Sequence, residues 1–294
     1  MRFRTAVAVV IALTGSGAAA ATAQVVKPAA DSSGDPFLWL EDQRGPRAMA
    51  WVNTENARTM AVLEKDPHFA SYYHDALAIA QASDRIPYAS FIGGALYNFW
   101  QDSAHVRGIW RRTTPASYRT AHPEWTTVLD IDSLARAEMA NWVWEGADCA
   151  MPAEKRCMIV LSDGGEDANT AREFDLGTRT FVANGFVLPH GKQRFTWVGT
   201  DTLLVAREWT PGDLTASGYP FIVKRMVRGH SLASATEVFR GAATDGGYGV
   251  SPGTVWDGAG NHVTVIDRPT STFEAEKYLV RPGGVTRLAL PLKS

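Results

Sequence analysis

Four stretches of the chain repeat one pattern of apolar and polar positions: an aromatic residue, a tight turn, and an apolar strand that ends in charge. They are SFIGGALYNFWQD (90–102), WVWEGADCAMPAEKRCMIVLSD (142–163), FTWVGTDTLLVAREW (195–209) and TVWDGAGNHVTVIDR (254–268). A repeat of roughly fifty residues with about four short strands is typical of the blades of a β-propeller. The pattern therefore predicts a mainly β chain, in which residues 87–294 form a partial β-propeller of about four four-stranded antiparallel blades stacked face to face.

The aromatic residues that open the repeats are Phe91, Trp144, Trp197 and Trp256, and the tryptophans are expected to lie mostly in blade cores. Further strands are predicted at 108–114, 126–132, 171–176, 219–227, 236–241 and 277–282. Alternation is clearest at the end of the chain, where Thr286, Leu288, Leu290 and Leu292 would share one face of a strand over 285–292. Glycine pairs such as Gly164-Gly165 mark turns between strands.

Two helices are predicted before the repeats, in an N-terminal helical segment at 35–86. Pro46 predicts a helix from Arg47 to about Glu64, because proline is favoured in the first helical turn. Pro67 predicts a second helix within HFASYYHDALAIAQASD (68–84). Apolar residues recur at helical spacing in both, so each helix has an apolar stripe that needs a surface to pack against.

The first residues read as a targeting segment. Arg2 and Arg4 precede the apolar run Ala6–Leu13, and Ala21-Thr22-Ala23 is an A-x-A cleavage site. The apolar run is too short to span a bilayer, although a retained N-terminal anchor is the alternative. We expect a signal peptide at 1–23 cleaved after Ala23, a disordered lead at 24–34, and a periplasmic or secreted protein without a membrane span.

Composition narrows the function and gives the cysteines a context. The chain has 294 residues and a formal net charge of −2, without the concentrated basic face that nucleic-acid binding requires. Its two cysteines, Cys149 and Cys157, flank turn residues within one predicted hairpin. In an oxidising compartment they can form a disulfide. Two free thiols across the hairpin remain the alternative, and two ligands are too few for a zinc site.

One motif resembles a catalytic serine. Residues 249–253 read Gly249-Val250-Ser251-Pro252-Gly253, a formal G-x-S-x-G. A nucleophile elbow requires a strand before the serine and a helix directly after it. The residues that follow predict a hairpin instead, and His262 is too close in sequence to leave room for an intervening aspartate. We therefore expect a loop between blades and no catalytic residue in the chain.

The remaining candidates do not form a recognisable site. His68 and His74 lack the spacing of paired metal ligands on a helix, and the other histidines are scattered: His105, His122, His190, His230 and His262. Asp163, Glu166 and Asp167 lack the regular alternation of a calcium loop and predict a polar turn. Asp245-Gly246-Gly247 is not followed by the GK[ST] of a phosphate loop. No metal or cofactor is expected.

Several segments resemble the prolyl oligopeptidase family of serine peptidases. DPFLWLED (35–42), followed by AWVNTENA (50–57), is similar to the N-terminal signature of that family, and LSDGGEDANTAREFD (161–175), GFVLP (185–189) and SGYPFIVK (217–224) are similar to its propeller segments. The resemblance extends from about Asp35 to Val285. It implies a seven-bladed propeller that restricts access to a C-terminal α/β-hydrolase domain, on which the N-terminal helices would pack.

The resemblance implies hydrolysis of short peptides after proline, through a serine, histidine and aspartate of the hydrolase domain. The chain ends within the propeller pattern, so we expect the propeller portion alone, inactive by itself. Its expected partners are short peptides and either a separate hydrolase domain or a second copy joined through open blade faces. The alternative function is a non-catalytic propeller that binds a peptide or glycan.

Overall fold

The computed structural model describes residues 34–257 and 259–293. The predicted signal peptide and nearly all of the predicted lead lie outside these residues, so export stays a prediction. The chain divides into two compact units, 1–73 and 74–294, with the boundary inside the second helix. Among the described residues, the helices are either too short or too polar to cross a membrane.

The described part of the first unit is built around a single long helix. A short 3₁₀ helix, η1 (Leu38–Leu40), precedes α1 (Pro46–Leu63), whose N-cap is Gly45 and whose first residue is the predicted proline. Trp39 of η1 packs edge-on against Trp51 of α1, with 6.3 Å between ring centroids. The guanidinium of Arg47 lies over the Trp39 ring at 4.2 Å. The segment 35–42 is thus held against the helix that follows it.

The second helix, α2 (Phe69–Gln81), starts within the first unit and ends within the second. Both predicted helices are present, with ends within a few residues of those expected. Large residues of the expected apolar stripes are exposed, namely Met49, Met60, Leu63, Tyr72, Tyr73 and Leu77. Trp51, Val62 and Ile79, outside the expected stripes, are exposed as well.

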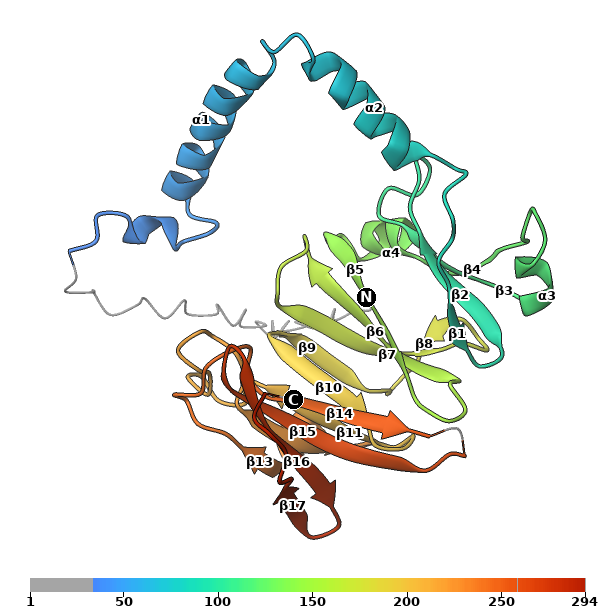
Figure 1. The fold of residues 1–294 in the computed structure, drawn as a ribbon, viewed down its shortest axis with the longest axis vertical. Coiled ribbons are helices and arrows are strands. Elements are labelled where there is room, and N and C mark those ends of the chain that lie inside the picture. Colours follow the sequence, from blue (N-terminus) through green and yellow to red (C-terminus); the bar gives the residue numbers. More distant parts are fainter. Residues whose placement is uncertain (1–33, 258, 294) are drawn as a thin grey trace, which may run out of the picture. The chain divides into compact units, whose positions relative to one another are not determined.

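The second unit contains four antiparallel sheets in chain order (Figure 1). The first contains β1 (Ser90–Ile92), β2 (Ala95–Trp100), β3 (Ile109–Thr113) and β4 (Thr126–Asp130). The second contains β5 (Trp142–Cys149), β6 (Arg156–Asp163), β7 (Asn169–Asp175), β8 (Thr180–Phe181) and β9 (Val187–Gly191). The third contains β10 (Gln193–Trp197), β11 (Thr202–Arg207), β12 (Ile222–Val227) and β13 (Thr236–Arg240), and the fourth β14 (Ser251–Trp256), β15 (His262–Ser271), β16 (Glu274–Arg281) and β17 (Gly284–Arg287).

The sheets stack because their middle strands are apolar on both faces. Side chains alternate across a strand, so odd and even positions meet different neighbours. In β6, Cys157, Ile159 and Leu161 join a core cluster with the first sheet, whereas Met158 joins a cluster with the third. In β11, Leu203 and Val205 face the second sheet, whereas Leu204 and Ala206 face the fourth. The predicted mainly β fold of about four stacked propeller blades is confirmed.

The structure corrects the number of strands in one blade and the ends of two strands. β9 pairs with β7 beside β8, so the second sheet has five strands rather than four. The strand predicted over 126–132 ends at Asp130, whose side chain accepts a hydrogen bond from the Ser133 N–H and begins α4 (Ile131–Glu138). Neither α4 nor the short α3 (Pro115–Tyr118) was predicted.

The strand predicted over 285–292 was also too long. β17 ends at Arg287, and Leu290 and Leu292 beyond it are exposed. Apolar alternation at the end of the chain therefore did not produce a buried strand face. Pro291 has no N–H to donate to a strand ladder, which disfavours extension of the sheet through this segment.

Candidate functional site

The G-x-S-x-G segment forms part of a β-hairpin. Ser251 is the first residue of β14, which pairs antiparallel with β15. Ser251 lies opposite Asp267, whereas His262 lies opposite Trp256 at the other end of the hairpin. This geometry does not provide the strand, sharp turn and helix that expose a nucleophilic serine.

Gly249 of the same motif has a packing role. Its φ is +73°, and an added Cβ would lie 2.4 Å from the carbonyl oxygen of Pro220. Gly253 has a negative φ and open space where a Cβ would be. The first glycine of the motif is thus explained by close packing between two loops and not by catalysis.

Each histidine that contacts a carboxylate does so singly. His190 Nε2 lies 2.7 Å from Glu166 Oε1, His105 Nδ1 lies 2.9 Å from Asp102 Oδ1, and His68 Nδ1 lies 3.2 Å from Asp66 Oδ1. The His262 ring stacks on Trp256. Across 34–257 and 259–293, no group of three histidine, cysteine or acidic side chains is placed to hold a metal ion.

The predicted cysteine hairpin contains a disulfide. Cys149 and Cys157 lie directly opposite each other on β5 and β6, and their sulfur atoms are bonded. The bond closes the Ala150–Lys155 turn beside the first inter-blade core cluster, to which Cys157 belongs. Cys149 also lines a cavity of about 480 Å³ between the first two sheets.

Residues that are scattered in the sequence meet in a cavity of about 410 Å³, which we call the Tyr219 pocket. Its lining is polar and aromatic, and comes from the loops and strand starts of three sheets. The lining residues are Asp167, Asn169, Lys192, Gln193, Arg194, Tyr219, Pro220 and Tyr248. Of the acidic cluster singled out in the sequence, only Asp167 lines this pocket.

Hydrogen bonding and charge connect the walls of the Tyr219 pocket. The Tyr219 hydroxyl donates to Asp167 Oδ2 at 2.9 Å, and Lys192 Nζ lies 3.6 Å from the same oxygen. Lys192 Nζ also lies 4.3 Å from the centre of the Tyr219 ring. The hydrogen bond to Asp167 raises the pKa of Tyr219, which keeps its hydroxyl a donor. The Tyr248 ring meets the Tyr219 ring edge-on at 5.6 Å.

The floor of the pocket is fixed by the side-chain amide of Gln193. Gln193 Nε2 donates to the carbonyl oxygens of Asn169, at 2.8 Å, and Pro189, at 3.1 Å. Gln193 Oε1 accepts from Arg207 Nη1 at 3.1 Å, and burial lowers the pKa of Arg207. Gln193 is buried, so its side-chain amide needs these hydrogen bonds. They connect the start of β10 to β7 and β11.

The second cation of the pocket is Arg194, which differs from Lys192 in its surroundings. It lies opposite Ala206 across β10 and β11, on the face of the third sheet that looks toward the fourth. Among the described residues, its guanidinium has no hydrogen-bond or ion-pair partner, although its charge acts on the Tyr219 hydroxyl. A guanidinium in this position presents donors to a ligand.

A third cavity, of about 790 Å³, lies on the first sheet and is lined in part by His122. The Arg111 guanidinium lies over two rings there, 4.2 Å from the centre of Trp100 and 4.4 Å from that of Trp125. Burial lowers the pKa of Arg111 to about 10, so it remains charged at neutral pH. Arg111 Nε donates to Asn98 Oδ1, which ties this cation into the sheet.

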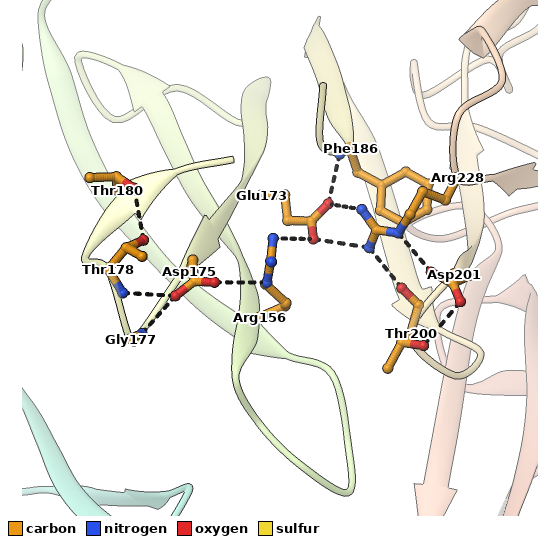
Figure 2. A network of polar contacts seen from close by, with 10 residues as sticks. All are labelled: Arg156, Glu173, Asp175, Gly177, Thr178, Thr180, Phe186, Thr200, Asp201 and Arg228. Atoms are coloured by element: carbon orange, nitrogen blue, oxygen red, sulfur yellow. Dashed lines mark hydrogen bonds and ion pairs between the residues drawn. The ribbon is translucent and has the colours of Figure 1, made fainter. Parts of the chain in front are cut away.

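An ion-pair network links the second and third blades (Figure 2). The Glu173 carboxylate on β7 accepts from Arg228 Nη1 and Nη2, and from the Phe186 N–H at 2.8 Å. Arg228 Nε donates to Asp201 Oδ1 at 2.7 Å, and Arg156 lies on the other side of Glu173, 3.6 Å away. The sequence analysis singled out neither Glu173 nor Arg228, because no local sequence pattern indicates that they form a pair.

The comparisons with known proteins identify the family. Residues 19–246 match the model for the prolyl oligopeptidase N-terminal β-propeller domain. The chain is 50% identical to an uncharacterized peptidase of Sinorhizobium fredii over 218 residues, which are 74% of this chain and 30% of that protein. It is 28% identical to an uncharacterized peptidase of Rickettsia prowazekii over 209 residues, which are 68% of this chain and 29% of that protein.

Solved structures agree on the fold. A post-proline cleaving enzyme from Rickettsia typhi matches with a TM-score of 0.79 and 24% identity, over 87% of this chain and 38% of that one. Oligopeptidase B from Leishmania major matches with a TM-score of 0.64 and 15% identity, over 88% of this chain and 35% of that one. The chain thus spans less than two fifths of the length of these relatives. It belongs to the prolyl oligopeptidase family, through the N-terminal β-propeller domain of that family.

Proposed function

We propose that this chain is the propeller portion of an exported serine peptidase that hydrolyses short peptides after proline, and that it is inactive alone. The observation that carries the proposal is the stack of four blades together with the match to the family's propeller model. In this proposal the chemistry belongs to an α/β-hydrolase domain with its own serine, histidine and aspartate. The position of Ser251 in a hairpin supports inactivity, because its neighbours cannot activate it.

The outer face of the fourth blade supports an additional partner. Val255 and Val263 lie directly opposite each other on β14 and β15 and are 60% and 50% exposed. Leu279 on β16 pairs with Val265, which alternation places on the same face. Apolar sheet faces are normally covered in a propeller. We propose that a further blade, a hydrolase domain or a second copy covers it.

The exposed stripes of α1 and α2 support docking of a hydrolase domain. Met49 and Leu63 of α1 are both close to half exposed, and Tyr72 and Tyr73 of α2 are more exposed still. Large apolar side chains gathered on helices are typical of protein contact surfaces.

The proposed export rests on the N-terminal sequence and on the disulfide. Arg2, Arg4, the apolar run and the A-x-A site form a signal-peptide pattern. The bonded pair Cys149 and Cys157 supports the proposal, because disulfides persist in oxidising compartments such as the periplasm. Mass spectrometry of the protein recovered from the periplasm or medium tests it, with a mature N-terminus at Gln24 as the expected result.

Peptidase assays test the proposed inactivity. The purified chain is incubated with a fluorogenic peptide that carries an internal proline, with and without a serine-directed inhibitor. We expect no turnover above the buffer rate. The Ser251→Ala variant is the matched control, since any contaminating activity would be the same in both preparations. Turnover that is blocked by the inhibitor and lost in Ser251→Ala would overturn the proposal.

A free-standing binding module for a peptide or glycan is the second candidate, and the Tyr219 pocket favours it. The pocket combines two tyrosine rings with charged and amide side chains, as ligand sites often do. A monodisperse protein that melts cooperatively and binds a ligand without a second chain would support this candidate. Solubility only with a partner chain would support the propeller portion of a larger assembly.

A further inference from the structure

We propose that the Tyr219 pocket binds a carboxylate group of a short peptide, with the Arg194 guanidinium as the group that pairs with it. The preference for an anion rests on the residues of the pocket, and the choice of a peptide as the carrier rests on the proposed function. The C-terminal carboxylate of the peptide is the source that we favour.

The charges of the pocket favour an anion. Lys192 and Arg194 supply two positive charges, and Asp167 supplies one negative charge that Lys192 already faces at 3.6 Å. Arg194 is left with an unneutralised charge at the pocket wall. A planar guanidinium matches a carboxylate with two parallel hydrogen bonds, and such charge-assisted bonds are stronger than neutral ones.

The two tyrosines give the pocket an apolar side next to this cation. Tyr219 and Tyr248 meet edge-on, and Tyr248 is 63% exposed, so its ring is accessible to a ligand. Aromatic side chains offer large contact areas at low cost in conformational entropy. The volume of about 410 Å³ suits one or two amino-acid residues of a peptide. A C-terminal residue with an apolar side chain could place its carboxylate on Arg194 and its side chain against the tyrosine rings.

The walls are held in place before any ligand binds. Ser217 Oγ donates to the carbonyl oxygen of Gly247 at 3.1 Å, which joins the loop before β12 to the loop that carries Tyr248. The Tyr219 N–H donates to Thr215 Oγ1 at 3.2 Å. Gly249 packs directly on Pro220 in the same place. Preorganisation of this kind reduces the ordering cost of binding.

Calorimetry with three matched peptides tests the proposal on the full chain. The peptides are acetyl-Ala-Ala-Phe with a free carboxylate, the same peptide as its C-terminal amide, and acetyl-Asp-Ala-Phe amide, which keeps one carboxylate in a side chain. We expect the free acid to bind at least about tenfold more tightly than the amide, the scale of one hydrogen bond to a charged group. Tight binding of the third peptide instead would support the carboxylate and assign it to an acidic side chain.

Two variants make the assignment specific to Arg194. Arg194→Gln should remove the difference between acid and amide, whereas the matched control Arg225→Gln, at another exposed arginine of the same sheet, should preserve it. Circular dichroism verifies that both variants fold. Equal affinities for acid and amide, an undiminished difference in Arg194→Gln, or no binding of any peptide would overturn the proposal. None of these results would bear on hydrolysis, so the proposed function is tested separately.

Discussion

Glu173 and Arg228 form a two-pronged ion pair across the boundary between the second and third blades. Arg228 Nη1 donates to Glu173 Oε2 at 2.8 Å, and Arg228 Nη2 donates to Glu173 Oε1 at 2.9 Å. The Glu173 side chain is fully buried, so its charge depends on these donors and on the Phe186 N–H. The pair therefore fixes the register of one blade against the next, in addition to the apolar packing.

Removal of Arg228 should destabilise the propeller strongly. Arg228→Met removes the ion-pair partner that contacts the buried Glu173 carboxylate with two hydrogen bonds. We expect a loss of about 3–5 kcal/mol in the free energy of unfolding. Urea denaturation followed by tryptophan fluorescence measures this loss. The matched control Arg225→Met changes an exposed arginine of β12, and should cost no more than about 0.5 kcal/mol.

The double variant Glu173→Met with Arg228→Met separates two explanations. Replacement of both charges by apolar groups removes the uncompensated carboxylate, so much of the stability should return. If the double variant were instead clearly less stable than Arg228→Met alone, an uncompensated Glu173 carboxylate would not be the cause of the stability loss in Arg228→Met.

Asp148 makes stability depend on pH. Burial raises its pKa from 3.8 to about 6, and its β5 position lies opposite the buried Met158. The folded state therefore holds the proton more tightly than the unfolded state. We therefore expect a stabilisation that is complete below about pH 4 and is lost as the pH rises through 6, by on the order of 3 kcal/mol.

Asp148→Asn tests this sign directly. The amide does not titrate, so the variant should lose the fall in stability between pH 4 and 7 and exceed the wild type at pH 7. Urea midpoints measured at half-unit pH intervals would reveal the difference. Parallel profiles for the two proteins would assign the pH dependence to other groups.

Reduction of the disulfide should cost about 2.5 kcal/mol, the value that the chain-entropy relation gives for so short a loop. Thermal or urea unfolding with and without dithiothreitol measures the effect. Cys149→Ala with Cys157→Ala is the control, because it should not respond to the reductant. A similar response in the wild type and this variant would point to an effect of the reductant unrelated to the bond.

The two glycines of the G-x-S-x-G segment should differ sharply. In Gly249→Ala, the alanine would have to adopt the left-handed backbone conformation of Gly249, and its Cβ would clash with Pro220. We expect the free energy of unfolding to fall by at least about 2 kcal/mol. Gly253→Ala meets open space and should be nearly neutral. Equal costs at the two positions would contradict the packing role that we assign to Gly249.

The sequence predicted the repeat unit well, because each blade has the same local requirements. Trp197 opens the third repeat and is nearly fully buried, whereas Phe91, which opens the first, is 63% exposed. The hairpin after Ser251 formed where turn residues predicted it. The helix α4 was missed because its sequence follows an apolar strand without a break. It is recognised from its two ends, where Asp130 caps the start and Met139 adopts a left-handed conformation at the end.

The Tyr219 pocket could not be predicted from local patterns. Asp167, Lys192, Tyr219 and Tyr248 are spread over more than one repeat, and only the stacking of blades brings them together. The pairing of Glu173 with Arg228 has the same origin. The sequence signal that could have suggested this pocket is the occurrence of charged and aromatic residues at equivalent loop positions in successive repeats.

The most direct test of the central claim is labelling of the purified chain with a fluorophosphonate, followed by intact-mass measurement. Such probes form a covalent adduct only with an activated serine. We predict no adduct, because Ser251 lies in a hairpin away from His262. A stoichiometric adduct that maps to a serine of this chain would contradict the account that the catalytic chemistry lies outside it.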